Sequence, residues 1–555
     1  MTIDLLIMKK LRIFFWVALA TMVIACSSDY EYYAPEIEIP EEPTEAIYFT
    51  EDELLVLMQM RNPNNRICIE EATEIALDAL DFFGAETNTR SGQMRSIAGV
   101  TALRGEPATR IGTRSADGSD VQIQMPDTVA FVFNFADDAG FTIVAADTRI
   151  TSRVLAFVED GNLDLNEELD HPGLEIFFTG LEEYIEYSIV EAEQLRESLL
   201  EEILAKMNKI GVRDTIFHDD ATTRGLLPPP PGGRPSEGLY FEAGRTITIT
   251  ETPGAWSTVE RVGPLLPVEW GQGFPFNHLV PRLCSSSPDG RAPAGCVATA
   301  AAMLMAYWEY PEWIDGFFMD WRLMNRFTAR TTASQNAYDN VRGKRSLPRF
   351  GDPLDDEQIM FRDNVARLME RIGAGVSMNY GCDGSNTSMQ RVVNFLHRIG
   401  YRNTWDNYFC TSKVINSLNM EGQRIGPVLA SGYRSRTLGI NHNGHAWIID
   451  GHLRRSREVL VTVTTAVHME PIQIPGEPPR RGHTVLTTAT HIRHELSSRY
   501  LHNNWGFNGR GNGFFVAGSF HVGDRRHYSD TRGAPPPLED RNYRYGNRIF
   551  LGIRP

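Results

Sequence analysis

The stretch APAGCVATAAAMLMAYWEYP, residues 292–311, places a single cysteine directly before a run of small and apolar residues. Four apolar side chains then recur at helical spacing and share one face of a predicted helix that ends near Pro311: Val297, Ala301, Leu304 and Trp308. Cys296 therefore lies at the helix N-terminus, where unpaired N–H groups and the helix dipole favour a thiolate. A packed structural thiol is the common alternative, so this motif alone leaves the role of Cys296 open.

A nucleophilic cysteine needs an imidazole base and a group that orients it. In the segment NGHAWIIDG, His445 begins a predicted strand and follows a glycine, which favours it as that base. His442, His452 and His502 are nearly as eligible from their sequence context. His442 and His445 have the spacing of a metal pair, but no carboxylate or cysteine completes a ligand set. We therefore expect no metal and no organic cofactor.

Length and composition limit the class of protein. A chain of 555 residues predicts two or three domains. Its hydrophobic content of 42% and charged content of 23% are typical of globular proteins. The net charge of -17 argues against a nucleic-acid partner, because phosphate binding needs clustered lysine and arginine.

The N-terminus predicts export. KKLRIFFWVALATMVIAC combines a basic start with an apolar run that is shorter than the roughly 20 residues of a spanning helix. Its last four residues resemble a bacterial lipobox, so residues 1–26 are interpreted as a signal peptide with lipidation at Cys26. A plain secretory peptide with a chance cysteine is the alternative. Residues 27–46 then form an acidic, proline-punctuated tether.

The remaining chain predicts an α+β protein. Residues 47–215 contain amphipathic helices and a hairpin in VAFVFNFADDAGFTIVAAD, and we expect them to form a small domain with its own core. Residues 216–250 are rich in proline and glycine and are interpreted as a linker. Residues 251–555 combine helices with strand-like segments and Gly/Asn turns. One disulfide is possible, but the spacing of the cysteines does not say which two would pair.

Four ordered motifs carry a resemblance to a known family. GCVATAAAMLMAYWEYP closely resembles the nucleophile segment of the streptopain family of secreted bacterial cysteine peptidases, which have a papain-like fold and are made as zymogens. VEWGQGFPFN, NGHAWIIDG and NNWGFNGRGNGFF resemble three further motifs of that family, and FVFNFADDAGFTIVAADTR resembles its prodomain core. Three positions depart from the family pattern: Phe276, Phe507 and Asn508.

The resemblance implies a role for each matching residue. Cys296 would be the nucleophile and His445 the general base, while Gln272 and the Cys296 N–H would hold the oxyanion. Asn504 and Trp505 would cover and position the histidine. Residues 47–215 would be an inhibitory propeptide, residues 216–250 its activation segment, and residues 251–555 the papain-like catalytic domain.

We therefore expect an exported cysteine endopeptidase that is made as a zymogen. Its partners would be protein or peptide substrates, its own prodomain, and a membrane reached through the lipid anchor at the outer membrane or cell surface. Alternatives are a papain-fold cell-wall peptide hydrolase or amide transferase, and a non-catalytic surface binding lipoprotein. About fifty residues between Gly451 and Leu501 form an insertion that could reshape the cleft or act as a lid.

Overall fold

A computed structural model describes most of the chain beyond the predicted tether. The described residues are 49–60, 64–84, 95–104, 109–114, 120–124, 126–166, 169–209, 214–215, 240–329, 344–402, 405–419, 426–437, 440–471, 481–520 and 547–555. The signal peptide with Cys26, the acidic tether and most of the predicted linker lie outside these residues. Among the described helices, none is long and apolar enough to cross a membrane.

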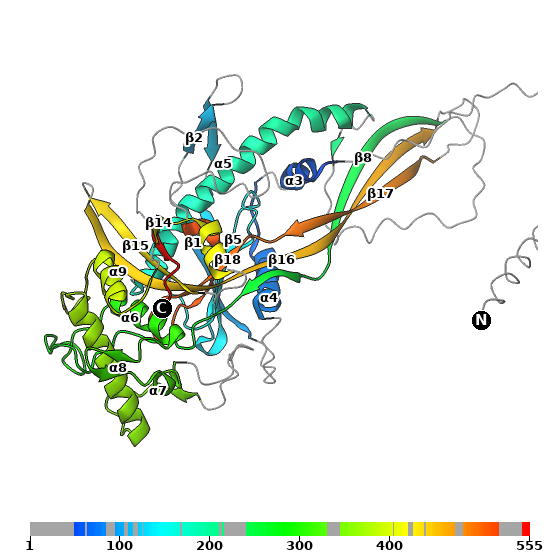
Figure 1. The fold of residues 1–555 in the computed structure, drawn as a ribbon. Coiled ribbons are helices and arrows are strands. Elements are labelled where there is room, and N and C mark those ends of the chain that lie inside the picture. The colour runs from blue at the N-terminus through cyan, green and yellow to red at the C-terminus, as the bar shows by residue number, and fades with distance from the viewer. Residues whose placement is uncertain are drawn as a thin grey trace, which may run out of the picture. The chain divides into compact units, whose positions relative to one another are not determined.

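We call the described residues up to 215 the N-terminal half and those from 240 onward the C-terminal half. One antiparallel sheet runs through both halves of the chain (Figure 1). Its strand order is β1-β4-β5-β6-β19-β18-β16-β15-β20-β14. The N-terminal half supplies β1 (Ile97–Arg104), β4 (Thr128–Phe135), β5 (Phe141–Ala145) and β6 (Val154–Val158). The C-terminal half supplies β19 (Gly513–Val516), β18 (Tyr500–Asn504), β16 (Ile440–Pro471), β15 (Val428–Thr437), β20 (Arg548–Leu551) and β14 (Trp405–Tyr408). The predicted hairpin is confirmed as β4 and β5, which pair around the short helix η1 (Ala136–Asp138).

The two halves meet edge to edge at β6 and β19. Phe157 pairs with Phe514 and Val158 with Gly513, so the ladder continues across the boundary. Contacts accordingly group Ala46–Pro555 as one compact unit. Side chains of both halves share one large buried cluster, while a smaller buried cluster lies within the N-terminal half alone and contains Ile67, Ala72, Ala76, Phe133 and Val144. Pairing the exposed edge of each sheet satisfies backbone groups that would otherwise remain open.

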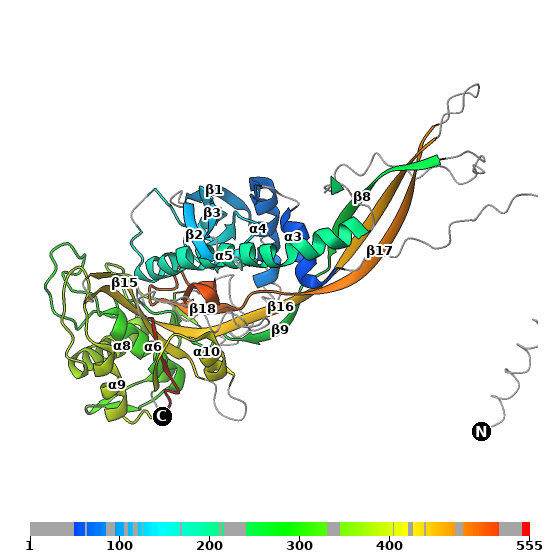
Figure 2. The ribbon, with the colours of Figure 1, turned by 90° about the horizontal axis from the view of Figure 1, so that it is seen from above.

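Strand β16 lies between two cores because its side chains alternate between the two faces of the sheet. Ala446 and Ile448 pack with α6 (Cys296–Trp308), whereas Trp447 and Ile449 pack with α5 (Pro172–Lys209). The predicted helix is confirmed as α6, which is buried throughout its length from residue 297 to residue 306. Figures 1 and 2 show α6, α8 (Asp356–Gly375) and α9 (Met389–Arg398) on the side of the sheet opposite α5.

The remaining elements are short or peripheral. The helices are α3 (Glu51–Met60), α4 (Ile69–Gly84), α7 (Trp321–Met324), α10 (Thr411–Leu418) and η3 (Ala517–Phe520). The small strands are β2 (Thr109–Arg114), β3 (Asp120–Gln124), β7 (Asp214–Thr215), β9 (Ser257–Val262), β10 (Trp313–Ile314), β11 (Phe317–Phe318), β12 (Phe327–Thr328) and β13 (Arg345–Ser346). A disulfide joins Cys284 to Cys382, a pairing that the cysteine spacing did not predict.

The described part of the insertion extends the sheet. Strand β16 continues beyond Gly451 to Pro471, and β17 (His483–Leu496) returns beside it. The strand β8 (Tyr240–Pro253) pairs with the other edge of β16, so the prediction of a linker was wrong for residues 240–250, where Ile247 and Ile249 are buried. Figures 1 and 2 show these strands side by side. We call β8, β17 and the part of β16 beyond Gly451 the arm.

Two glycines bring α5 into direct contact with the C-terminal half. A Cβ atom on Gly173 would lie 2.3 Å from the Trp505 ring, and one on Gly180 would lie 1.7 Å from the Ser519 carbonyl oxygen. Residues seven apart lie on the same face of a helix, so this face of α5 is flat where it meets the loop after β18, at Trp505, and η3, at Ser519.

Replacing Gly180 with alanine should lower the melting temperature of the full chain. Glycine to alanine inside a helix normally stabilises by about 1 kcal/mol, but here the added methyl group meets a backbone oxygen. Gly99→Ala is the control, because a Cβ atom added there would have nothing within 4 Å. A higher melting temperature for Gly180→Ala would contradict the close helix packing.

Candidate active site

Cys296 is the first residue of α6, as the sequence predicts. The residue before it, Gly295, has φ 95°, and a Cβ atom there would lie 2.9 Å from the Ser385 carbonyl oxygen. Only glycine fits this conformation and this space without strain. The turn therefore delivers the thiol to the start of the buried helix.

The Cys296 thiol is protonated in this state. Burial raises its pKa, and hydrogen bonding with the backbone of Ala446 and of the first helical residues only partly opposes that effect. This direction is opposite to the lowered pKa expected from the helix N-terminus, because burial has the larger effect in this state. The contact with Ala446 places the thiol beside the strand residue that follows His445.

His445 lies on β16 and is only 3% exposed. Its Nε2 lies 2.9 Å from the Trp505 carbonyl oxygen, and its ring stacks with those of Phe507 and Trp447. Burial lowers its pKa from 6.5 to about 3, with a smaller effect from the charge of His171. The imidazole is therefore neutral, and we assign its proton to Nε2 because a carbonyl can only accept. Nδ1 then remains a proton acceptor.

Gln272 is half-buried on a segment that is tied to α6. Its carbonyl accepts from the Ala294 N–H at 2.8 Å, two residues before the cysteine. The preceding carbonyl, of Gly271, lies 3.3 Å from the Thr299 hydroxyl on the first turn of α6. The structure thus brings Gln272 and Cys296 onto adjoining, bonded segments. Thr299 was not predicted from the sequence, where its signal is a hydroxyl one turn after the cysteine in an otherwise apolar helix.

Asn504 and Trp505 lie where β18 ends and the following loop begins. The Asn504 amide donates to the Val268 carbonyl at 3.3 Å, and its oxygen accepts from Gly506. It therefore joins the loop after β18 to the segment that carries Gln272. Trp505 orients His445 through its backbone carbonyl, while its indole is buried among aromatic rings and against Gly173.

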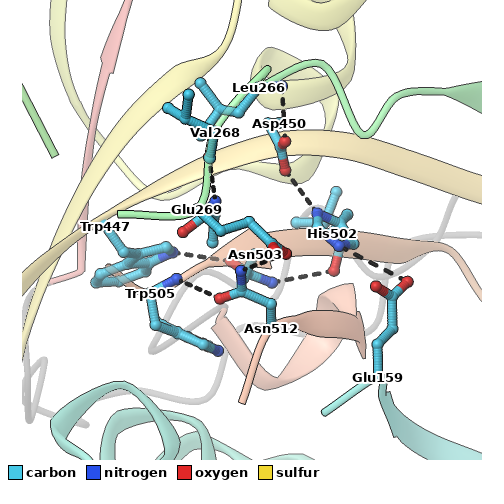
Figure 3. Close-up of polar contacts among 12 residues, drawn as sticks. Glu159, Leu266, Val268, Glu269, Trp447, Asp450, His502, Asn503, Trp505 and Asn512 are labelled. Atoms are coloured by element: carbon cyan, nitrogen blue, oxygen red, sulfur yellow. Dashed lines mark hydrogen bonds and ion pairs between the residues drawn. The ribbon is translucent and has the colours of Figure 1, made fainter. Parts of the chain in front are cut away.

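The other candidate histidines have different environments. His452 lies 2.8 Å from the Asn419 amide oxygen, and burial lowers its pKa. His502 lies 2.6 Å from Asp450, with Glu159 of the N-terminal half 3.9 Å from its other nitrogen (Figure 3). The side chain of His442 lies outside the described residues. Within the described part of the chain, no group of His, Cys, Asp or Glu side chains could hold a metal ion.

A buried polar network supports the loop that holds His445 (Figure 3). The Trp447 indole donates to Asn503 at 2.8 Å, and the Trp505 N–H donates to Asn512 at 3.0 Å. Asp450 accepts from the Leu266 N–H at 3.0 Å, which ties β16 to the segment leading to Gln272. These supporting residues were not predicted from the sequence, although NNWGFNGRGN carries unusually many amides for a buried segment.

The N-terminal half contacts the same loop. Nε2 of His171 lies 3.1 Å from the Arg510 carbonyl oxygen, and its ring lies 4.6 Å from that of Phe507. The Glu159 N–H donates to the Asn512 carbonyl, and the Gly511 N–H to the Asp160 carbonyl. The loop that fixes His445 is thus covered by residues from before the predicted linker.

We call the structure in which the N-terminal half covers the loop that holds His445 the closed state. Acid should lower the stability of this closed state through His445. The folded pKa of about 3 lies below the ordinary value of 6.5, so the unfolded chain binds an extra proton between these values. Stability is therefore lost as pH falls from about 6.5 towards 3, and one such group contributes about 2 kcal/mol of loss at pH 5. His171, whose pKa is lowered to about 4 by burial, acts in the same direction.

The measurement compares melting temperatures at pH 7 and pH 5 for the Cys296→Ala chain with and without His445→Gln. The drop on acidification should shrink in the His445→Gln chain, while His494→Gln, at an exposed position on β17, should leave it unchanged. An equal drop in all three chains would contradict the assignment of a buried neutral imidazole.

Comparisons with known proteins show which families and proteins this chain resembles. Residues 270–515 match the model of the Peptidase C10 family, and residues 65–185 match that of the Spi protease inhibitor. Streptopain of Streptococcus pyogenes serotype M1 is 23% identical over 393 residues, which cover 66% of this chain and 81% of streptopain. A thiol protease/hemagglutinin of Porphyromonas gingivalis is 44% identical over 50 residues, which cover 9% of this chain and 5% of that protein.

Two solved structures from Prevotella intermedia are also similar. A prointerpain A fragment is 15% identical with a TM-score of 0.38 and covers 80% of this chain and 98% of its own. Active interpain A cysteine protease is 18% identical with a TM-score of 0.30 and covers 53% of this chain and 95% of its own. The family matches and the arrangement of the site lead to one conclusion. Residues 270–515 form a cysteine peptidase region similar to the Peptidase C10 family, and a segment similar to the Spi protease inhibitor precedes them.

Proposed function

We propose that this protein is an exported cysteine endopeptidase made as a zymogen, with Cys296 and His445 as its catalytic pair. The observation that carries the proposal is the convergence of three segments. The start of α6 contacts the backbone of Ala446, next to His445, and is bonded to the segment that carries Gln272. Export, with a lipid anchor on Cys26 at the outer membrane or cell surface, rests on the lipobox-like N-terminus.

In the active form, Nδ1 of His445 takes the thiol proton of Cys296, and the thiolate attacks the peptide carbonyl carbon. The Gln272 side chain and the Cys296 N–H stabilise the oxyanion of the tetrahedral intermediate. His445 then gives its proton to the leaving amine, which leaves an acyl-enzyme. A water molecule, deprotonated by His445, releases the acid product and restores the thiol.

The closed state lacks this catalytic pair. Cys296 and His445 are both neutral, and the hydrogen bonds described for them lead to Ala446 and Trp505 rather than to each other. His445 also lies on the sheet face that packs against the N-terminal half, beside Trp447. Departure of that half would admit water, raise the His445 pKa and allow the thiolate–imidazolium pair to form.

The sequence left two alternative functions open. A purely non-catalytic binding lipoprotein is disfavoured, since residues 270–515 match the Peptidase C10 family. A cell-wall peptide hydrolase or an amide transferase would use the same pair of residues on another acyl donor. The substrate, rather than the chemistry, separates that alternative from the proposal.

Denatured casein should be degraded under reducing conditions by the chain from Ser27 onward, with cleavage of the chain itself within residues 219–238. A Cys296→Ala chain should do neither, because it lacks the nucleophile. Both chains are followed on a gel over hours, with and without an added protease that cuts the predicted linker. A parent chain that leaves casein intact after that cut but hydrolyses cell-wall peptides would favour the alternative function over the proposal.

Gln272→Ala should reduce kcat on a peptide substrate by about 10²–10³-fold with little change in KM, because the lost donor acts on the developing oxyanion. Gln390→Ala, at an exposed position on α9, is the matched control and should retain parental rates. A Gln272→Ala enzyme with parental kcat would remove this residue from the oxyanion site.

A further inference from the structure

The arm carries an apolar strip that is covered by the N-terminal half. Its inner face presents buried valines and isoleucines from β16 and β8: Val459, Val461, Val463, Ile247 and Ile249. They pack in one cluster with side chains of α3 and the C-terminal part of α5: Leu54, Val56, Leu57, Ile203 and Met207. Figure 2 shows α3 and α5 beside these strands. The insertion thus provides a contact surface for the N-terminal half that shares no residue with the proposed active site.

A buried arginine fixes the base of the arm to the end of a helix. Arg455 is 6% exposed and donates to the carbonyls of Asp81 and Phe82, in the last turn of α4. A cation at a helix C-terminus is favoured by the helix dipole and satisfies carbonyls that lack partners within the helix. The other end of the guanidinium donates to the Trp256 carbonyl, so Arg455 bonds both halves at once.

Two aromatic residues complete this contact. The Phe82 ring lies 5.1 Å from that of Trp256 in an edge-to-face arrangement. The Arg455 guanidinium lies 5.2 Å from the centroid of the Phe82 ring. The neighbouring Phe83 ring lies 5.0 Å from that of Tyr500 and stacks with Phe514 at 5.5 Å. Arginine and aromatic side chains in buried positions are the residues that most often dominate the binding energy of an interface.

We propose that the arm and the Arg455 contact form a second binding site for the N-terminal half, and that they retain it as an inhibitor after the chain is cut between residues 209 and 240. This proposal rests on the zymogen function proposed above. Strand β8 lies beyond such a cut and stays paired with β16, so the apolar strip remains intact. The contacts of α3, α4 and α5 with the arm also do not depend on the covalent connection. Cleavage alone would then leave the peptidase closed, and dissociation would be the activating step.

The test uses the full chain from Ser27 with Cys296→Ala and a recognition sequence for a narrow-specificity viral protease placed within residues 221–237. The C-terminal half is immobilised by a terminal tag, the chain is cut to completion, and release of the N-terminal half is timed. We expect the halves of the parent to remain together after cutting. Arg455→Met and Phe82→Ala should each release the N-terminal half at least about 30-fold faster.

Arg493→Met is the matched control, because Arg493 lies on the arm and pairs with Glu251 of β8 within the arm. It should release at the parental rate. The N-terminal half of the double variant Arg455→Met/Phe82→Ala should be released more slowly than the product of the two single rate increases predicts, since the two residues contact each other. Melting curves of the uncut chains establish whether each variant folds. If Arg455→Met does not fold, Phe82→Ala still tests the proposal.

Immediate separation of the cut parent, or equal release by Arg455→Met and Arg493→Met, would overturn the proposal. Restoring Cys296 adds a second readout, in which the cut Arg455→Met chain should degrade casein sooner than the cut parent. A cut parent that is fully active with both halves bound would refute retention as an inhibitor. Absence of activity in every chain would instead refute the peptidase function, and the release rates would still report on the binding site.

Discussion

The alternation of side chains along β16 is the constraint on which the rest of the structure depends. Even-numbered residues such as Ala446 and Ile448 face α6, and odd-numbered residues such as Trp447 and Ile449 face α5. A strand buried on both faces cannot shift its register by one residue without exchanging these two sets. The same alternation places the His445 side chain on the face that packs against the N-terminal half, while the Ala446 backbone meets Cys296.

Burial determines the electrostatics of the closed state. Each member of the proposed catalytic pair is neutral because its charged form would lose water without gaining an opposite charge. The supporting amides of Asn503 and Asn512 are bonded to other groups of the protein, so the loop that holds His445 is fixed in advance. A supporting loop that is already bonded, together with a neutral thiol and a neutral imidazole, fits a site whose residues are in place before the thiolate–imidazolium pair forms.

The N-terminal half is held by three different kinds of contact. The β6–β19 ladder supplies backbone hydrogen bonds, the glycine face of α5 supplies close packing, and the arm supplies apolar area together with the Arg455 cap. Backbone pairing and close packing act next to the proposed active site, whereas the arm acts through residues outside it. Under the proposed zymogen function, an insertion in the catalytic half would therefore set how long the N-terminal half stays bound without altering the proposed catalytic residues.

The sequence by itself determined the elements whose signals are local. Helical spacing after Cys296, the turn in the Asp137–Gly140 hairpin and the ordered motifs around Gln272 and His445 each depend on neighbouring residues. Only the tertiary structure decided the shared core, the Cys284–Cys382 pairing, the arm and the neutral state of the thiol and imidazole. These features arise from contacts between residues far apart in the chain, and pKa values follow from burial and from neighbours that no local pattern encodes.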